Sequence, residues 1–123
     1  MKVYKLSFGS VIILAPPNLA EVIINEGVII DELNVDEYHD FLLTNLDAPP
    51  FSLLVNKKHS YTYTFEAQKI IGKLKGIKNT AVVTSTTGAL MSTEMLMHIN
   101  SDVRDSVKIF NNREEALAYL KKE

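Results

Sequence analysis

Short apolar runs, separated first by tight turns and later by segments of helical period, constrain the fold of this chain more than any other feature. Within the first thirty residues, the stretches 3–8, 11–15 and 20–25 have the composition of strands. The connections between them are short, with Gly9-Ser10 as the predicted first turn. Short connections favour antiparallel pairing, so the sequence predicts an N-terminal antiparallel meander.

After residue 30, strand-like runs alternate with segments in which apolar residues recur every three or four positions. Strands are predicted at 51–55, 80–84 and 107–110, and helices at 34–46, 64–76, 88–99 and 112–122. Strands that are joined by single helices run parallel in one sheet. The sequence therefore predicts a single α/β domain over residues 1–123, with a mixed sheet in which the meander is followed by βαβαβα crossovers.

Polar residues that cap helices mark three of the predicted helix starts. Asn34 is followed by Glu37, and Asn112 by Glu115, which is the spacing of a capping box. Thr64 is the predicted N-cap of the second helix. These signals place the start of the first helix at Asn34.

Composition excludes several classes of function. The 123 residues include 13 Lys and Arg against 15 Asp and Glu, which leaves a formal net charge of −2. A chain of this charge has no general electrostatic attraction for nucleic acid or anionic membranes, so neither is an expected partner. Cysteine is absent, which excludes disulfides, thiol catalysis and thiolate metal sites.

The N-terminus resembles a secretory leader only superficially. Lys2 and Lys5 precede an apolar run at 11–15, but five residues are fewer than the roughly seven to fifteen of a leader's apolar region. Apolar stretches elsewhere are far shorter than the roughly 18 residues that a membrane-spanning helix needs. We therefore expect a cytoplasmic protein without stable membrane insertion.

The segment 56–64 is the strongest candidate for a binding site. It follows a predicted parallel strand and leads into a helix, and ligands of open α/β sheets bind at the carboxyl ends of such strands. The candidate partner- or ligand-binding residues are Asn56, Lys57, His59, Ser60, Tyr61 and Tyr63. A solvated loop, in which the two tyrosines cover the edge of the sheet, is the alternative interpretation.

Catalytic and metal-binding patterns are weak. His59 lies beside Ser60, but adjacent side chains rarely face each other, and no acidic residue accompanies them as in a hydrolase triad. His39, His59 and His98 lack the spacing of metal-binding motifs, and glycine-rich phosphate loops are absent. We expect no catalytic residue, no metal and no cofactor.

The predicted helix at 88–99 is unusually apolar. Met91, Met95 and Met97 accompany leucine and isoleucine on more than one of its faces. Methionine surfaces adapt to protein partners and acyl chains, so this helix is a candidate contact for a homodimer or another partner. On the other helices, spacing assigns Leu33 and Phe65 to the inward faces.

Three segments of the chain resemble a known family. Ile24-Asn25-Glu26-Gly27-Val28, the strand with Asn56-Lys57 and Ser60-Tyr61, and the capped helix ending Glu115-Ala116-Leu117-Ala118-Tyr119-Leu120 are similar to passages of small bacterial SpoIIAA-like proteins. That group is related to the STAS domain and is often described as STAS/SEC14-like. The resemblance covers nearly the whole chain and implies the STAS/SpoIIAA-like fold.

The resemblance also implies a role in regulation or binding rather than catalysis. In related anti-sigma-factor antagonists a phosphorylated serine lies in an Asp-Ser-Ser-Gly turn, which this chain lacks. Ser60, Thr62 and Thr64 are the hydroxyls near that place and are therefore the candidate phosphate acceptors. The leading interpretation is a non-catalytic protein-interaction module. The alternative is a carrier for a lipid or nucleotide, which an apolar cavity beneath the helix at 88–99 would favour.

Overall fold

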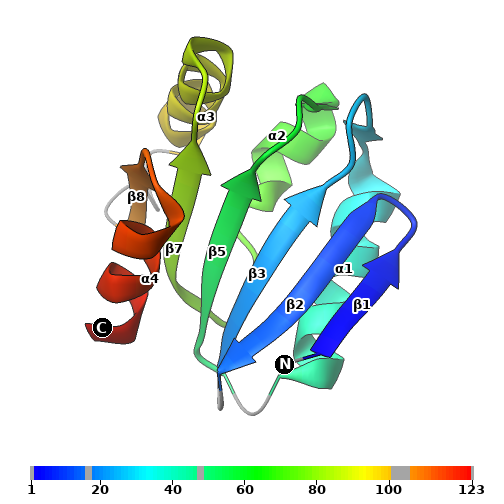
Figure 1. Cartoon of the computed structure of the whole chain (residues 1–123). Coiled ribbons are helices and arrows are strands. Elements are labelled where there is room, and N and C mark those ends of the chain that lie inside the picture. The colour runs from blue at the N-terminus through cyan, green and yellow to red at the C-terminus, as the bar shows by residue number, and fades with distance from the viewer. Residues whose placement is uncertain (1, 16–17, 47–48, 101–105, 123) are drawn as a thin grey trace.

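A six-stranded mixed sheet forms the centre of the structure (Figure 1). The computed structural model describes residues 2–15, 18–46, 49–100 and 106–122. The strands lie in the order β1-β2-β3-β5-β7-β8. Their bounds are β1 (Lys2–Leu6), β2 (Gly9–Ala15), β3 (Leu19–Ile24), β5 (Phe51–Lys57), β7 (Ile77–Thr84) and β8 (Val107–Phe110).

The sheet combines the two predicted kinds of pairing. Strands β1, β2 and β3 pair antiparallel, whereas β3, β5, β7 and β8 pair parallel. The short connections of the first three strands and the helical crossovers of the others account for this difference. The predicted mixed α/β fold with an N-terminal meander is therefore confirmed.

Two short strands form a separate small sheet that the sequence did not predict. Strand β4 (Ile29–Ile30) pairs parallel with β6 (Thr62–Tyr63). The candidate segment 56–64 is therefore not a continuous loop. Lys57 completes β5, and backbone bonds from Thr62 to Val28 and from Thr64 to Ile30 hold the end of this segment.

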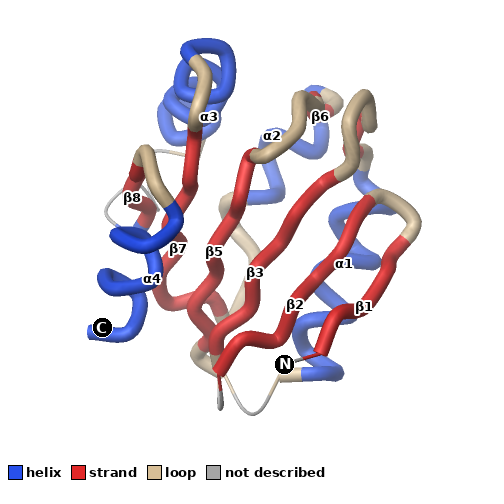
Figure 2. The backbone as a smooth tube through the Cα atoms, in the orientation of Figure 1, coloured by secondary structure: helices blue, strands red, loops and turns tan. Residues whose placement is uncertain are grey.

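Helices cover both faces of the main sheet. They are α1 (Glu32–Asn45), α2 (Phe65–Ile71), α3 (Thr87–Ile99) and α4 (Arg113–Lys122). Figure 2 shows α1 and α2 behind the sheet and α4 in front of it. Helix α3 follows β7 and packs beside α2. The chain thus forms three layers: helices α1, α2 and α3 on one face of the sheet, the sheet itself, and helix α4 on the other face.

Helix starts agree with two of the three capping predictions. Thr64 accepts a bond from the backbone N–H of Ala67, and Asn112 accepts one from Glu115. The prediction for α1 was wrong, because Asp31 is its N-cap and Asn34 completes the capping box three residues later. Asp31 and Asn34 satisfy each other's backbone N–H, so Asn34 lies inside the helix.

The first turn also differs from its prediction. Ser7 and Phe8 form the turn, and Gly9 is the first residue of β2. A Cβ atom at Gly9 would lie 2.2 Å from the carbonyl oxygen of Ile23, so the close approach to β3 requires glycine. The glycine that indicated a turn therefore serves strand packing.

Two apolar clusters make up the core, one on each face of the sheet. The larger contains Val22, Tyr38 and Phe51 and lies beneath α1 and α2. The smaller contains Leu54 and Leu120 and lies beneath α4.

Two residues that helical spacing assigned to inward faces are instead exposed. Leu33 is 77% exposed and Phe65 is 61% exposed. Each lies in the first turn of its helix. The inward assignment of both residues was therefore wrong.

Candidate functional site

A pocket of about 370 Å³ lies between the sheet and helices α1, α2 and α3. Its lining is mostly apolar and comes from β3, β5, β7 and the three helices. Side chains that define its walls include Val22, Val55, Val82, Tyr38, Ile71 and Leu96. The pocket therefore interrupts the packing between the sheet and the layer of three helices.

The alternation of side chains along β5 determines which residues face the pocket. Leu53, Val55 and Lys57 line it, whereas Leu54 belongs to the cluster beneath α4. Successive side chains of a strand point to opposite faces, so every second residue contributes. Lys57 is the last residue of the strand and places an amino group in this apolar surrounding.

Lys57 is deeply buried for a charged residue. It is 7% exposed, and its Nζ lies 5.5 Å from the ring centre of Tyr61 and 5.8 Å from that of Tyr63. Burial lowers the pKa of the Lys57 amine to about 8, because the charged form loses its hydration. Cation–π attraction to the two rings stabilises the charged form of this group.

Three tyrosines surround this end of the pocket. Tyr38 and Tyr63 line it, and the rings of Tyr61 and Tyr63 meet edge to face. The Tyr61 and Tyr63 hydroxyl oxygens lie 3.4 Å apart. Burial raises the pKa of all three phenols, so they remain neutral hydroxyls at neutral pH.

Helix α3 forms the wall opposite α1. Thr93, Leu96, Met97 and Asn100 line the pocket at helical spacing, and Met91 lies outside on an exposed face. Thr93 is buried and donates its hydroxyl to the Ala89 carbonyl, as threonine often does within helices. The apolar residues of α3 are therefore divided between the pocket and solvent.

Asn100 joins α3 to α2. Its Nδ2 donates to the carbonyl oxygens of Gln68 and Leu96, at 2.9 Å and 3.0 Å. The two helices approach closely here, since a Cβ atom at Gly72 would lie 2.7 Å from the Asn100 side chain. Among the described residues, the buried Oδ1 of Asn100 has no hydrogen-bond partner.

The structure divides the six predicted binding residues. Lys57 and Tyr63 line the pocket, and Tyr61 contacts Lys57. Ser60 is exposed, and its backbone N–H donates to Glu26. His59 is half-buried outside the pocket lining, and Asn56 lies on the opposite face of the sheet.

The candidate phosphate acceptors also differ in their surroundings. Ser60 and Thr62 are exposed. The Thr64 hydroxyl oxygen accepts the backbone N–H of Ala67 and caps α2. Phosphorylation at any of the three stays a prediction.

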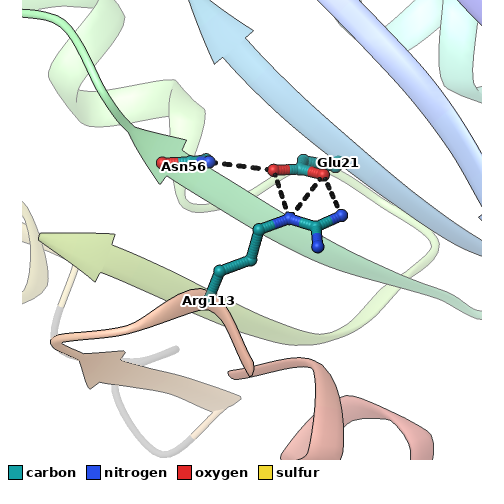
Figure 3. Close-up of polar contacts among 3 residues, drawn as sticks. All are labelled: Glu21, Asn56 and Arg113. Carbon is teal, nitrogen blue, oxygen red and sulfur yellow. Dashed lines mark hydrogen bonds and ion pairs between the residues drawn. The ribbon is translucent and has the colours of Figure 1, made fainter. Parts of the chain in front are cut away.

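The sequence did not predict the buried carboxylate of Glu21 on the other face of the sheet (Figure 3). Glu21 is 2% exposed, and its carboxylate accepts bonds from Arg113 Nη2 at 2.7 Å and from Nε at 3.1 Å. Asn56 Nδ2 donates to the same carboxylate at 2.9 Å. A glutamate within the otherwise apolar strand Leu19–Ile24 was the available signal.

Known proteins add evidence on the fold. No family model matches the chain, and no curated protein matches its sequence. A solved structure, an uncharacterised protein of the DUF3478 family with a SpoIIAA-like fold from Shewanella loihica PV-4, superposes with a TM-score of 0.58 at 13% identity. The superposition covers 97% of this chain and 90% of that protein. This chain has a SpoIIAA-like fold. The fold that the sequence resemblance implied is therefore confirmed.

Within the described part of this SpoIIAA-like fold, metal-binding side chains are not grouped. No three His, Asp or Glu side chains converge there to hold a metal ion. The Nε2 of His39 instead lies 2.9 Å from the Lys75 carbonyl oxygen. In the same part of the chain, no helix has both the length and the apolar character to cross a membrane.

Proposed function

We propose that this protein is a non-catalytic binding protein for a small, mainly apolar molecule held in the pocket between the sheet and α1–α3. The single observation that carries the proposal is the apolar pocket itself, with a volume of about 370 Å³. Of the two interpretations from sequence, the cavity beneath α3 favours the ligand carrier.

The size of the pocket supports a ligand rather than imperfect packing. Protein interiors pack as densely as organic crystals, and voids larger than a water molecule are few. Ligand sites have volumes of about 300–1,000 Å³ and a few polar groups among apolar walls. Polar side chains on this lining include Lys57, Tyr38, Tyr63 and Asn100.

The arrangement of reactive groups supports binding rather than turnover. Among the described residues, no hydrogen bond joins His59 to Ser60, and neither of them lines the pocket. A nucleophile requires a base within hydrogen-bond reach. The pair that suggested a hydrolase therefore lacks the required geometry.

Binding of a neutral fluorescent dye tests this proposal. N-phenyl-1-naphthylamine, which is uncharged and emits strongly in apolar surroundings, is titrated into delipidated protein. We expect saturable binding to one site. Val55→Phe places a ring in the pocket and should weaken binding at least about tenfold, because the dye and the ring compete for the same volume.

A matched variant separates the pocket from the exposed surface of α3. Met95 is 57% exposed, so Met95→Gln removes apolar surface outside the pocket and should leave the dye affinity unchanged. Val82→Phe provides a second pocket-filling variant if Val55→Phe does not fold. Absence of saturable dye binding, or loss of binding in Met95→Gln but not in the filled variants, would contradict the proposal.

The exposed face of α3 supports a second candidate function, contact with a protein partner or a second copy of the chain. Leu90, Met91 and Met95 are exposed to 36%, 64% and 57%. Sedimentation velocity tests the homodimer. If α3 forms it, Met91→Glu with Met95→Glu should convert dimer to monomer, whereas a monomeric wild-type protein would exclude a homodimer at the concentrations tested.

A further inference from the structure

We propose that the ligand is a long-chain carboxylate or a similar amphiphile with one negative charge, and that its anionic group pairs with the ammonium of Lys57. This inference rests on the proposed function, since it names the chemistry of the molecule in the same pocket. Its basis is a buried cation at one end of an apolar space.

Lys57 lacks an acidic partner in the described part of the chain. The ion pair found there joins Arg113 to Glu21 on the opposite face of the sheet. The Nζ of Lys57 instead meets the rings of Tyr61 and Tyr63. Attraction between an ammonium ion and aromatic rings is weaker than the hydration that a buried ion loses. A bound anion would supply the missing stabilisation.

The neighbouring tyrosines do not supply that negative charge. Tyr38, Tyr61 and Tyr63 lie at this end of the pocket, and all three are buried or half-buried phenols. A neutral phenol donates a hydrogen bond but does not neutralise an ammonium ion. Their hydroxyls would instead be available as donors to a carboxylate oxygen.

The pocket extends from Lys57 along the sheet, so the apolar part of a ligand can lie within it. Lys57 pairs with Thr84 in the sheet, whereas the far lining residue Val107 pairs with Thr80. Four residues of strand separate these positions, or about 13 Å at the usual rise. Val55 and Val82 lie between them on the pocket face. A hydrocarbon chain that extends from Lys57 toward Val107 would therefore contact apolar walls.

The number of charges favours a single anionic group. Lys73, the other lysine on the lining, is exposed, so Lys57 is the buried cation that a ligand would neutralise. One ammonium balances one negative charge, and a second buried charge would remain without a partner. Carboxylates meet this condition at neutral pH.

Competition between three probes with ten-carbon chains tests the inference. Decanoate, 1-decanol and decyltrimethylammonium are titrated at pH 7 against protein that holds the neutral dye. We expect decanoate to displace the dye at a concentration at least about tenfold lower than 1-decanol does. The cationic probe should be the weakest, because its charge repels Lys57.

Two lysine variants identify the side chain that pairs with the negative charge of the ligand. Lys57→Met removes the buried ammonium at similar volume and should abolish the preference for decanoate over 1-decanol; Lys57→Gln is a second neutral variant if the first does not fold. Lys78→Met removes an exposed lysine that is not part of the pocket lining and should retain the preference.

The outcomes separate this inference from the proposed function. If the neutral dye does not bind at all, the proposed function fails. A second outcome is that the dye binds, but decanoate and 1-decanol displace it equally or not at all. The proposed binding function then stands, and the inference of an anionic ligand is overturned. A preference that survives Lys57→Met, or that disappears in Lys78→Met, would also overturn it.

Discussion

Lys57 lies inside the fold because the side chains of β5 alternate between the two faces of the sheet, and Lys57 falls on the face of the pocket. Leu53 and Val55 are buried or half-buried on the same face, and the next residue on that face is Lys57. A lysine at the end of a strand usually extends its amine to solvent. Here Tyr63 of β6 and the preceding residue Tyr61 lie near the amine.

The buried amine predicts a pH dependence of stability. The unfolded chain holds the Lys57 proton up to about pH 10.5, whereas the folded protein releases it near pH 8. Unfolding therefore takes up a proton between these values, and folded stability rises with pH. Relative to Lys57→Met, the delipidated wild-type protein should gain about 1–2 kcal/mol between pH 7 and pH 9.5.

Urea denaturation of both proteins at each pH measures this difference. Tyr38, Tyr61 and Tyr63 are present in both proteins, so their titration affects the two curves alike. Parallel pH profiles would show that the Lys57 pKa is not lowered by folding.

The buried ion pair of Glu21 and Arg113 leads to a second prediction about stability. Arg113→Ala removes the partner of a carboxylate that is 2% exposed and should lower the free energy of unfolding by roughly 2–4 kcal/mol. Adding Glu21→Leu removes the unpaired charge and should restore most of this loss.

Chemical denaturation followed by circular dichroism gives both values. Equal stability of Arg113→Ala and the wild-type protein would contradict a structural role for the pair. The single variants and the double variant together form a cycle that isolates the interaction energy.

At the scale of elements, α3 buries few of its side chains in the core. Among its described side chains, Thr93 is the buried one, and the others that face inward meet the pocket rather than a filled interior. Helix α4, in contrast, buries Ala116 and Leu120 against the sheet. A helix with few buried apolar contacts opens more easily.

Ligand binding should therefore change hydrogen exchange mainly in α3. With 1-decanol bound, the amides of α3 should exchange at least about threefold more slowly, because the ligand supplies the missing contacts of Leu96 and Met97. Those of α4 should not change. Hydrogen exchange measured by mass spectrometry makes this comparison, and protection confined to α4 would be incompatible with a ligand beneath α3.

Local sequence signals predicted the start of a helix correctly where one short-range hydrogen bond determines it. Asn112 and Thr64 cap their helices as expected, since each bond is formed within three residues. Asn34 was misassigned because Asp31 offers an equally good cap one turn earlier. Strand β6 was missed because two residues become a strand only through pairing with Ile29 and Ile30.

At the scale of the whole molecule, the order of strands and helices was sufficient to predict a mixed sheet and its fold class. The pocket was not predictable in the same way. Its walls join residues as distant as Val22 and Val107, and its volume depends on how closely α3 approaches the sheet. The sequence indicated Lys57 and Tyr63 as binding candidates but not the apolar walls beside them.

The location of a bound chain tests the central claim most directly. Nuclear Overhauser effects are measured between decanoate and the labelled methyl groups of Ile, Leu, Val and Met. We predict contacts from the hydrocarbon chain to Val55, Val82 and Leu96, which line the pocket. Contacts confined to the exposed Met91 and Met95, or no contacts to the protein, would contradict the account.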